Sequence, residues 1–306
     1  MVLNTTLYDN VKRYNIDIIT IKMITGGIIM SYKIVGDSCT DLPIELKNDA
    51  NIQLVPLSMQ VDDEIFVDDS TFNQLEFLRK MAASKECPKS SCPSPESYMN
   101  AFEGADDIYV ITLSSKLSGS YNSAELAKKL YLEEHPNKNI EIIDSKSASA
   151  GQTVLVYKLK ELLEKGTSFK ETVEQVYAFR DTMHTKFVLE SLDNLRKNGR
   201  LSNLTAVICS ALNIKPIMGD DDGEIIKLDQ ARGVERALLK MIKYVEEDVK
   251  DAKNRILGIS HCNNYERALF VKEEILKRIP FAKCFIADTS GIASLYANDG
   301  GIVISY

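Results

Sequence analysis

Ile108-Tyr-Val-Ile-Thr-Leu113 is a run of six residues with almost no polar side chain, and Ser114-Ser-Lys-Leu-Ser-Gly-Ser120 follows it directly. An unbroken apolar run of this length is typical of a strand in a parallel sheet that helices cover on both faces. The serine-bearing loop then leads into Ser118–Glu134, whose pattern predicts a helix. A strand, a polar loop and a helix in this order predict an α/β architecture.

Segments on either side of this unit repeat its order of elements. Strands are predicted over Tyr32–Val35, Ile52–Leu57 and Ile140–Ile143. Helices are predicted over Thr71–Ala83, from Ser94 onward and over Ala148–Glu164. Asp41 is expected to be the N-cap of a further helix that starts near Pro43. We therefore predict an N-terminal domain, residues 30–166, built on an open, mostly parallel sheet with flanking helices.

Gly166-Thr167 marks the predicted domain boundary, because the order of elements changes after it. Gly219-Asp-Asp-Asp-Gly223 lies between Ile214–Met218 and Glu224–Leu228 and predicts a hairpin. The remaining predicted helices are Phe169–Met183, Leu201–Leu212, Gly233–Val249 and Tyr265–Arg278, and the remaining strands are Phe187–Leu189, Ile256–Ser260, Cys284–Ala287 and Gly301–Ser305. A hairpin among helices predicts a smaller α+β domain over residues 167–306.

Residues 1–29 are expected to be an extension of doubtful structure ahead of the first domain. Ile16–Ile29 is rich in apolar residues, but Asp17 and Lys22 interrupt it. A transmembrane helix needs about 20 nearly uncharged residues, so stable membrane insertion is not expected. The segment also lacks the charged-then-apolar order of a signal peptide, and we therefore expect the chain to stay in the cytoplasm.

The charge balance excludes several kinds of partner. The 306 residues carry a formal net charge of −7, and the pI is about 5.2. A nucleic-acid interface needs a concentrated positive field, so no nucleic-acid partner is expected. The field of the protein mildly repels anions, and any anionic ligand must therefore be held by local donors. The six cysteines lie far apart without a CxxC pair, which favours reduced thiols over a metal site.

Serine-bearing loops follow three of the predicted strands and lead into helices. They are Gly36–Asp41, Ser114–Ser120 and Asp144-Ser145, and a fourth, Lys89–Pro95, precedes a helix without a strand that can be placed. In an open parallel sheet such loops meet at the carboxyl ends of the strands, where helix N-termini present free N–H groups. Hydroxyl donors added there make a site for a small anion. The alternative is that each serine simply caps its own helix.

The anion is expected to be a carboxylate. A phosphate cradle normally uses a GxGxxG or a GxxxxGK[ST] loop, and the chain contains neither. Two or three hydroxyl or amide donors are enough to bind a carboxylate.

Four motifs resemble those of the DegV family, in order and at fitting spacings from about Met30 to Tyr306. They are Asp37-Ser-Cys-Thr-Asp-Leu42, Ser90-Ser-Cys-Pro-Ser-Pro95, Ser114-Ser-Lys-Leu-Ser-Gly-Ser120 and Leu192-Asp-Asn-Leu-Arg-Lys-Asn-Gly-Arg-Leu201. The resemblance implies two α/β domains with a fatty acid buried at their junction. It also implies similarity to the fatty-acid-binding subunit of bacterial fatty acid kinase, which presents the carboxylate to a separate kinase subunit.

For this chain the resemblance implies a long-chain fatty acid as ligand, no cofactor, no metal and no catalytic residue. The carboxylate would be bound by Ser90, Ser91, Ser114, Ser115, Arg200 and Tyr296, with loop support from Asp37, Ser38 and Gly119. The family usually has threonine at Ser90 and glutamine at Cys92. Serine keeps the hydroxyl donor but fixes its rotamer less. Some members have histidine where this chain places Tyr296, whose phenol can still donate to a carboxylate.

A lipid hydrolase that uses one of the loop serines is the main alternative. His261 follows a predicted strand and is the best candidate for its base, whereas His135 and His184 fit a charged loop and a helix C-terminus. The chain has no GxSxG motif to supply a nucleophile for His261, which counts against a hydrolase. A metal site at Asp220–Asp222 lacks the spacing of a calcium loop, and a transcriptional module lacks a basic helix.

Overall fold

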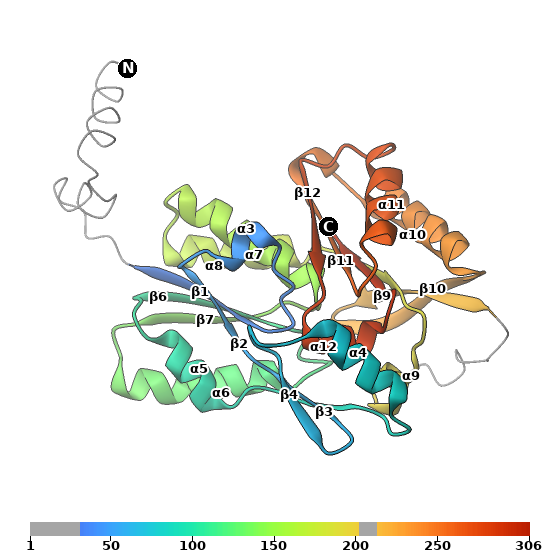
Figure 1. Cartoon of the computed structure of the whole chain (residues 1–306). Helices are drawn as coiled ribbons and strands as arrows, with labels where there is room; N and C mark the ends of the chain where they lie inside the picture. The colour runs from blue at the N-terminus through green and yellow to red at the C-terminus, as the bar shows by residue number, and fades with distance from the viewer. Residues whose placement is uncertain (1–30, 202–212) are drawn as a thin grey trace, which may run out of the picture.

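Four parallel strands form the N-terminal sheet, in the order β2-β1-β6-β7 (Figure 1). The structure is a computed structural model, and it describes residues 31–201 and 213–306. The strands are β1 (Tyr32–Asp37), β2 (Ile52–Val55), β6 (Asp107–Thr112) and β7 (Asn139–Asp144). Val35 pairs with Val110, and Val110 pairs with Ile142, so three branched side chains meet on one buried face. The predicted parallel sheet is confirmed.

Helices cover both faces of this sheet (Figure 1). The helices α5 (Pro95–Phe102) and α6 (Ser120–Glu134) pack on one face. The other face carries α7 (Ala150–Glu164), α8 (Phe169–Arg180) and the short α3 (Ile44–Lys47). The start of α8 is fixed by a capping box, in which Ser168 and Glu171 satisfy each other's backbone N–H groups.

A small antiparallel sheet, which the sequence pattern does not predict, follows β2. Its strands β3 (Ser58–Val61), β4 (Glu64–Val67) and β5 (Lys89–Ser91) pair in the order β4-β3-β5. Helix α4 (Gln74–Ala83), capped by Asn73, lies between β4 and β5 in the chain. Ser90 therefore lies in a strand of this small sheet, and not in a loop at the edge of the parallel sheet as the fourth serine loop suggested.

Six strands form the C-terminal sheet, in the order β10-β9-β8-β13-β11-β12. Their bounds are β8 (Thr185–Val188), β9 (Ile214–Asp221), β10 (Glu224–Arg232), β11 (Ile256–His261), β12 (Lys283–Asp288) and β13 (Ile302–Ser305). The β9–β10 hairpin is confirmed, and Asp222 and Gly223 at its tip both have positive φ, as a tight hairpin turn requires. Helices α10 (Val234–Asp248) and α11 (Tyr265–Leu276) pack on this sheet.

Helix α7 lies between the two larger sheets, because it contacts β1 and β6 as well as β11 and β13. One apolar cluster accordingly contains Val154 of α7 together with Phe285 of β12. Helix α8 still packs on the N-terminal sheet, and the chain enters the C-terminal sheet at β8. The domain division at residue 166 stays a prediction. The predicted helix Leu201–Leu212 and the extension 1–29 fall on residues 202–212 and 1–30, which are outside the described part of the chain.

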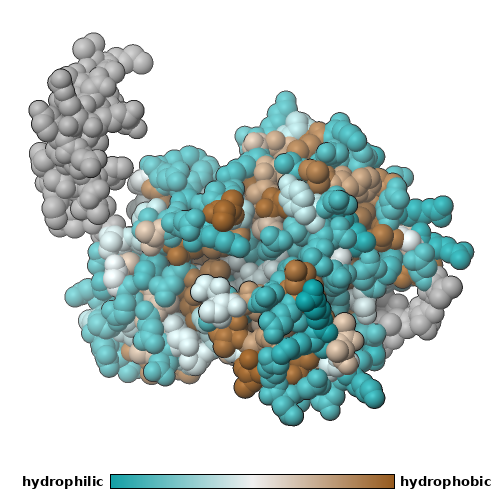
Figure 2. Space-filling view, viewed as in Figure 1, coloured by the Kyte–Doolittle hydropathy of each residue, from teal (hydrophilic) through white to brown (hydrophobic). Residues whose placement is uncertain are grey.

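The visible surface is mostly hydrophilic, with apolar residues gathered near its centre and toward the upper right of the view (Figure 2). Exposed apolar side chains over the described residues include Ile44 and Ile65. Within residues 31–201 and 213–306, none of the helices combines the length and the hydrophobicity that crossing a membrane demands.

Candidate functional site

An apolar cavity lies where the N-terminal loops meet the C-terminal sheet. Its wall includes Cys39, Leu113, Leu117 and Ala148 from those loops, and Phe187, Leu189, Ile225 and Val303 from the C-terminal sheet and the segments next to its strands. The short helix α12 (Gly291–Ala297) adds Ile292, Ala293, Tyr296 and Ala297. These four residues follow the helical repeat, so one face of α12 is turned to the cavity. An apolar wall with a few charged side chains suits an elongated apolar ligand with a polar end.

Ser90, Arg200 and Tyr296 meet beside this cavity and form what we call the head-group cluster. The hydroxyl of Ser90 and the phenol of Tyr296 are 2.9 Å apart, in a hydrogen bond between residues far apart in the chain. The guanidinium carbon of Arg200 lies 5.8 Å from the centre of the Tyr296 ring, and its Nε donates to the carbonyl of Leu117 at 3.1 Å. Burial raises the pKa of Tyr296, so the phenol keeps its proton at neutral pH and can donate.

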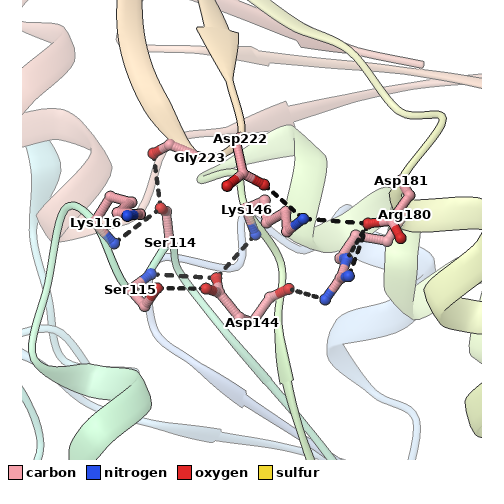
Figure 3. A network of polar contacts seen from close by, with 9 residues as sticks. All are labelled: Ser114, Ser115, Lys116, Asp144, Lys146, Arg180, Asp181, Asp222 and Gly223. Atoms are coloured by element: carbon pink, nitrogen blue, oxygen red, sulfur yellow. Dashed lines mark hydrogen bonds and ion pairs between the residues drawn. The ribbon is translucent and has the colours of Figure 1, made fainter.

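The other three expected carboxylate-binding residues are placed differently. Ser91 is exposed next to Ser90 in β5. Ser114 is buried and donates its hydroxyl to the carbonyl of Gly223 at 2.7 Å, while the hydroxyl of Ser115 donates to the carboxylate of Asp144 (Figure 3). Among the described residues, the cavity wall includes Arg200 and Tyr296 and none of these serines.

Ser114 and Ser115 belong to a polar network that joins the N-terminal loops to the tip of the β9–β10 hairpin (Figure 3). Lys146 pairs with Asp222 at 2.6 Å, and its backbone N–H donates to Asp144 at 3.0 Å. Lys146 and Gly223 are both part of the cavity wall. The network therefore fixes one side of the cavity by bonds between the two domains.

Asp37 and Ser38 form hydrogen bonds that join the end of β1 and the loop after it to neighbouring segments. Asp37 is buried and accepts from the backbone N–H of Leu113 at 2.7 Å and from the side-chain amide of Gln152 at 2.8 Å. Burial raises the pKa of Asp37 to about 6, although these donors oppose the shift. The hydroxyl of Ser38 accepts from the N–H of Leu57 at 3.0 Å.

Two further contacts pack the loops around the head-group cluster. A Cβ added to Gly119 would lie 3.2 Å from the sulfur of Cys92, so the loop before α6 approaches the segment after β5 closely. The side-chain amide of Asn198 donates to the carbonyl of Pro88 at 3.0 Å, which connects the end of α9 (Asp193–Lys197) to the start of β5. The motif of the second domain is thereby held against the N-terminal motifs.

Asp41 has a different role from the helix cap that the sequence predicts. Pro43 is the N-cap residue of α3, and Asp41 is fully buried. Its carboxylate accepts from the backbone N–H of Ser290 at 2.6 Å and from the hydroxyl of Ser149. Both partners lie far along the chain, and no local rule could have indicated them. Burial raises the pKa of Asp41 to about 7.

Asp68 reaches the same end of α12 and was not singled out by the sequence. It lies just after β4, is only 5% exposed, and accepts from the N–H groups of Gly291 at 2.6 Å and Ile292 at 2.9 Å. Burial raises its pKa as well. Two carboxylates from the N-terminal half therefore bind the first residues of the helix that carries Tyr296.

His261 has a carboxylate neighbour but no hydrogen-bonded serine among the residues that the structure describes. Its Nε2 lies 3.4 Å from a carboxylate oxygen of Asp288, and its Nδ1 accepts the backbone N–H of Asn264 at 3.2 Å. Burial lowers its pKa. Over the described residues, no serine hydroxyl is hydrogen-bonded to this histidine, so the pairing of nucleophile and base is missing there. The hydrolase alternative is not supported.

Two of the three aspartates of the hairpin have partners in the structure. Asp220 accepts from the backbone N–H of Thr185 at 2.6 Å, and Asp222 pairs with Lys146. In residues 31–201 and 213–306, no group of three His, Cys, Asp or Glu side chains is arranged to hold a metal ion.

Comparison with known proteins gives a family for this architecture. A family model described as "Uncharacterised protein, DegV family" matches residues 31–306. A DegV domain-containing protein of Streptococcus gordonii is 41% identical over 283 residues, which cover 90% of this chain and 99% of the relative.

Solved structures of similar proteins carry fatty acids. A DegV family protein of Ruminococcus gnavus, refined with vaccenic acid, is 47% identical and matches with a TM-score of 0.88, covering 91% of this chain and 100% of the other. The fatty acid kinase (Fak) B3 protein of Streptococcus pneumoniae, loaded with linoleic acid, is 38% identical with a TM-score of 0.84, covering 90% and 99%.

Proposed function

Because this chain belongs to the DegV family, we propose that it binds a long-chain fatty acid, buries the acyl tail in the cavity and holds the carboxylate at the head-group cluster. The observation that carries this proposal is the apolar cavity whose wall includes Arg200 and Tyr296, with Ser90 hydrogen-bonded to that tyrosine. The fatty acids bound to the similar proteins of Ruminococcus gnavus and Streptococcus pneumoniae support it.

The acyl tail should supply most of the affinity. At about 0.8 kcal/mol for each buried methylene, a tail of roughly 14 methylenes gains on the order of 11 kcal/mol before entropy costs. Hydrogen bonds to the carboxylate contribute about 1.5–3 kcal/mol each, and much of this offsets the desolvation of the anion. The head-group contacts should therefore set the orientation and the head-group specificity of the ligand.

The head-group assignment combines the cluster with the neighbouring serines. Ser90, Arg200 and Tyr296 offer a hydroxyl, a guanidinium and a phenol at one place. Ser114 and Ser115 would join them by giving up their present acceptors, Gly223 and Asp144, since a hydroxyl has a single proton to donate. Ser91 is assigned to the rim of the same site. Donors of these kinds bind a carboxylate without a cofactor.

A separate kinase subunit is the proposed partner. The resemblance to the Streptococcus pneumoniae protein supports a division of labour in which this chain presents the carboxylate and the partner phosphorylates it. Formation of acyl phosphate by this chain and ATP alone would contradict that division. A cytoplasmic location, proposed on the sequence grounds given above, would be tested by cell fractionation.

Ser90→Ala and Ser115→Ala are each expected to weaken oleate binding about tenfold, because each removes one hydroxyl donor to the carboxylate. Isothermal titration of delipidated protein with oleate measures the effect. Ser168→Ala is the matched control, since it removes a serine hydroxyl that caps α8 on the N-terminal sheet, outside the cavity wall. This control should lose some stability and keep its oleate affinity.

The two serine variants separate the parts of the assignment. An unchanged affinity for Ser115→Ala would remove Ser115 from the head-group set and leave the Ser90 and Tyr296 pair. Unchanged affinity for both variants would place the carboxylate elsewhere. Failure of the wild-type protein to bind oleate at all would contradict the proposed function itself.

A further inference from the structure

We infer that Asp68, assisted by Asp41, is a positioning residue for the fatty acid carboxylate: it holds α12 in the place where Tyr296 meets Ser90. This inference rests on the proposed function, because it assigns to Tyr296 a part in binding the carboxylate. It extends that function to two buried carboxylates that touch neither the cavity nor the head-group cluster.

The first residues of α12 are bound almost entirely by side chains from the N-terminal half of the chain. Asp68 accepts from the N–H groups of Gly291 and Ile292, and Asp41 accepts from that of Ser290. These N–H groups are among those that a helix leaves without an internal acceptor. Because Asp68 and Asp41 are buried, the N–H groups would stay unpaired without them, and the helix would have to move to find other acceptors.

Gln74, the first residue of α4, adds a third contact at the same end. Its side-chain amide donates to the carbonyl of Thr289 at 2.8 Å and to the hydroxyl of Ser294 at 3.1 Å. Asp68 and Gln74 flank the short segment between β4 and α4. Both ends of this connection are therefore hydrogen-bonded to the start of α12. The small antiparallel sheet and α4 therefore place α12 relative to the N-terminal domain.

Gly291 shows how close this approach is. A Cβ added there would lie 2.7 Å from a carboxylate oxygen of Asp68 and 2.4 Å from the terminal methyl of Met59. Real Cβ atoms do not come so close to such atoms, so a larger residue at this position must displace the side chains of Asp68 and Met59 or move the start of α12 away from them. Gly291→Ala is thus a second way to disturb the same contact without removing any charge.

The position of α12 decides the head-group contact because this seven-residue helix carries Tyr296 close to the contacts at its start. Tyr296 lies four residues after Ile292, about one helical turn away along the axis. A shift of the helix by about 1 Å, or a small rotation, would break the 2.9 Å hydrogen bond between Tyr296 and Ser90. The apolar side chains on the cavity face tolerate such a shift better, since dispersion contacts depend less on direction.

The test compares two ligands with the same tail, oleate and oleyl alcohol, and reports the ratio of their dissociation constants. Tyr296→Phe should lower the preference for oleate, because it removes the phenol proton. Asp68→Asn should lower it about tenfold, by a similar amount to Tyr296→Phe. In the double variant Asp68→Asn should cause no further loss of preference, since it acts through Tyr296. Asp69→Asn, an exposed neighbour whose carboxylate bonds Thr71, is the control and should change neither constant.

The outcomes separate positioning from general support. If Asp68→Asn weakens both ligands equally, so that the ratio is unchanged, Asp68 supports only the fold and the inference is overturned. Additive losses of preference in the double variant overturn it as well. If Asp68→Asn does not fold, Gly291→Ala is measured in its place against the same outcomes. Wild-type protein that binds neither ligand overturns the proposed function, whereas a wild-type preference for oleate that Asp68→Asn leaves intact overturns only the positioning role.

Discussion

Ala293→Phe should lower the affinity for oleate about 100-fold while the protein still folds. Ala293 lies on the cavity face of α12, and a phenyl ring there would fill space that the acyl tail needs. Displacing about four methylenes at about 0.8 kcal/mol each costs about 3 kcal/mol, which corresponds to the stated factor. The fold should tolerate the ring, since Ala293 is part of the cavity wall and the ring gains apolar contacts there without overpacking the core. Isothermal titration with oleate, together with thermal unfolding, measures both effects.

The exposed Ala282 provides a matched control for this variant. It is outside the cavity wall, so Ala282→Phe adds the same ring without obstructing the tail. Equal oleate affinity for Ala293→Phe and the wild type would show that the tail does not occupy this cavity.

Asp41→Asn should become progressively more stable relative to the wild type as the pH rises from about 4 to about 7. The pKa of Asp41 is raised from 3.8 to about 7 by burial, against the hydrogen bonds from Ser149 and Ser290. A raised pKa means that the folded state binds more protons than the unfolded state in this window, so the wild type loses stability as the pH increases. Across this window the stability of the mutant relative to the wild type changes by at most about 4 kcal/mol, at about 1.36 kcal/mol for each pH unit.

Urea unfolding of both proteins at about pH 5 and about pH 8 measures this change, and the mutant-minus-wild-type difference cancels the opposing contributions of His184 and His261. Asp69→Asn serves as the control. Because the pKa of Asp69 is lowered, its titration changes the stability only at pH values below the two that are measured. If the mutant-minus-wild-type free energy of unfolding stays constant between the two pH values, or becomes larger toward acid pH, the raised pKa of Asp41 is contradicted.

The sequence predicted the elements whose residues carry a local signal. The apolar run Ile108–Leu113 becomes the buried strand β6, with only its ends differing, and the Gly219–Gly223 turn closes the β9–β10 hairpin. The small antiparallel sheet carries no such signal. Its strands have three or four residues, and most side chains of β4 are exposed, so neither periodicity nor a hydrophobic run marks them.

In the candidate site too, some features follow from neighbouring residues in the sequence, whereas others depend on residues far along the chain. The serine loops suggested an anion site, but the contact of Ser90 with Tyr296 joins the small sheet to α12 and could not follow from spacing. Asp41 has the local features of a helix cap, yet its acceptor atoms are taken by Ser149 and Ser290, both more than a hundred residues away. Tertiary partners therefore decided the role of each of these side chains.

Mass spectrometry of an organic-solvent extract from freshly purified protein tests whether the cavity holds an acyl tail. If the cavity holds an acyl tail, the extract should contain long-chain fatty acid in stoichiometric amount, and Ala293→Phe protein prepared in the same way should be depleted of it. A wild-type preparation that contains no fatty acid, and that also fails to take up added palmitate or oleate, would show that the cavity does not bind an acyl tail.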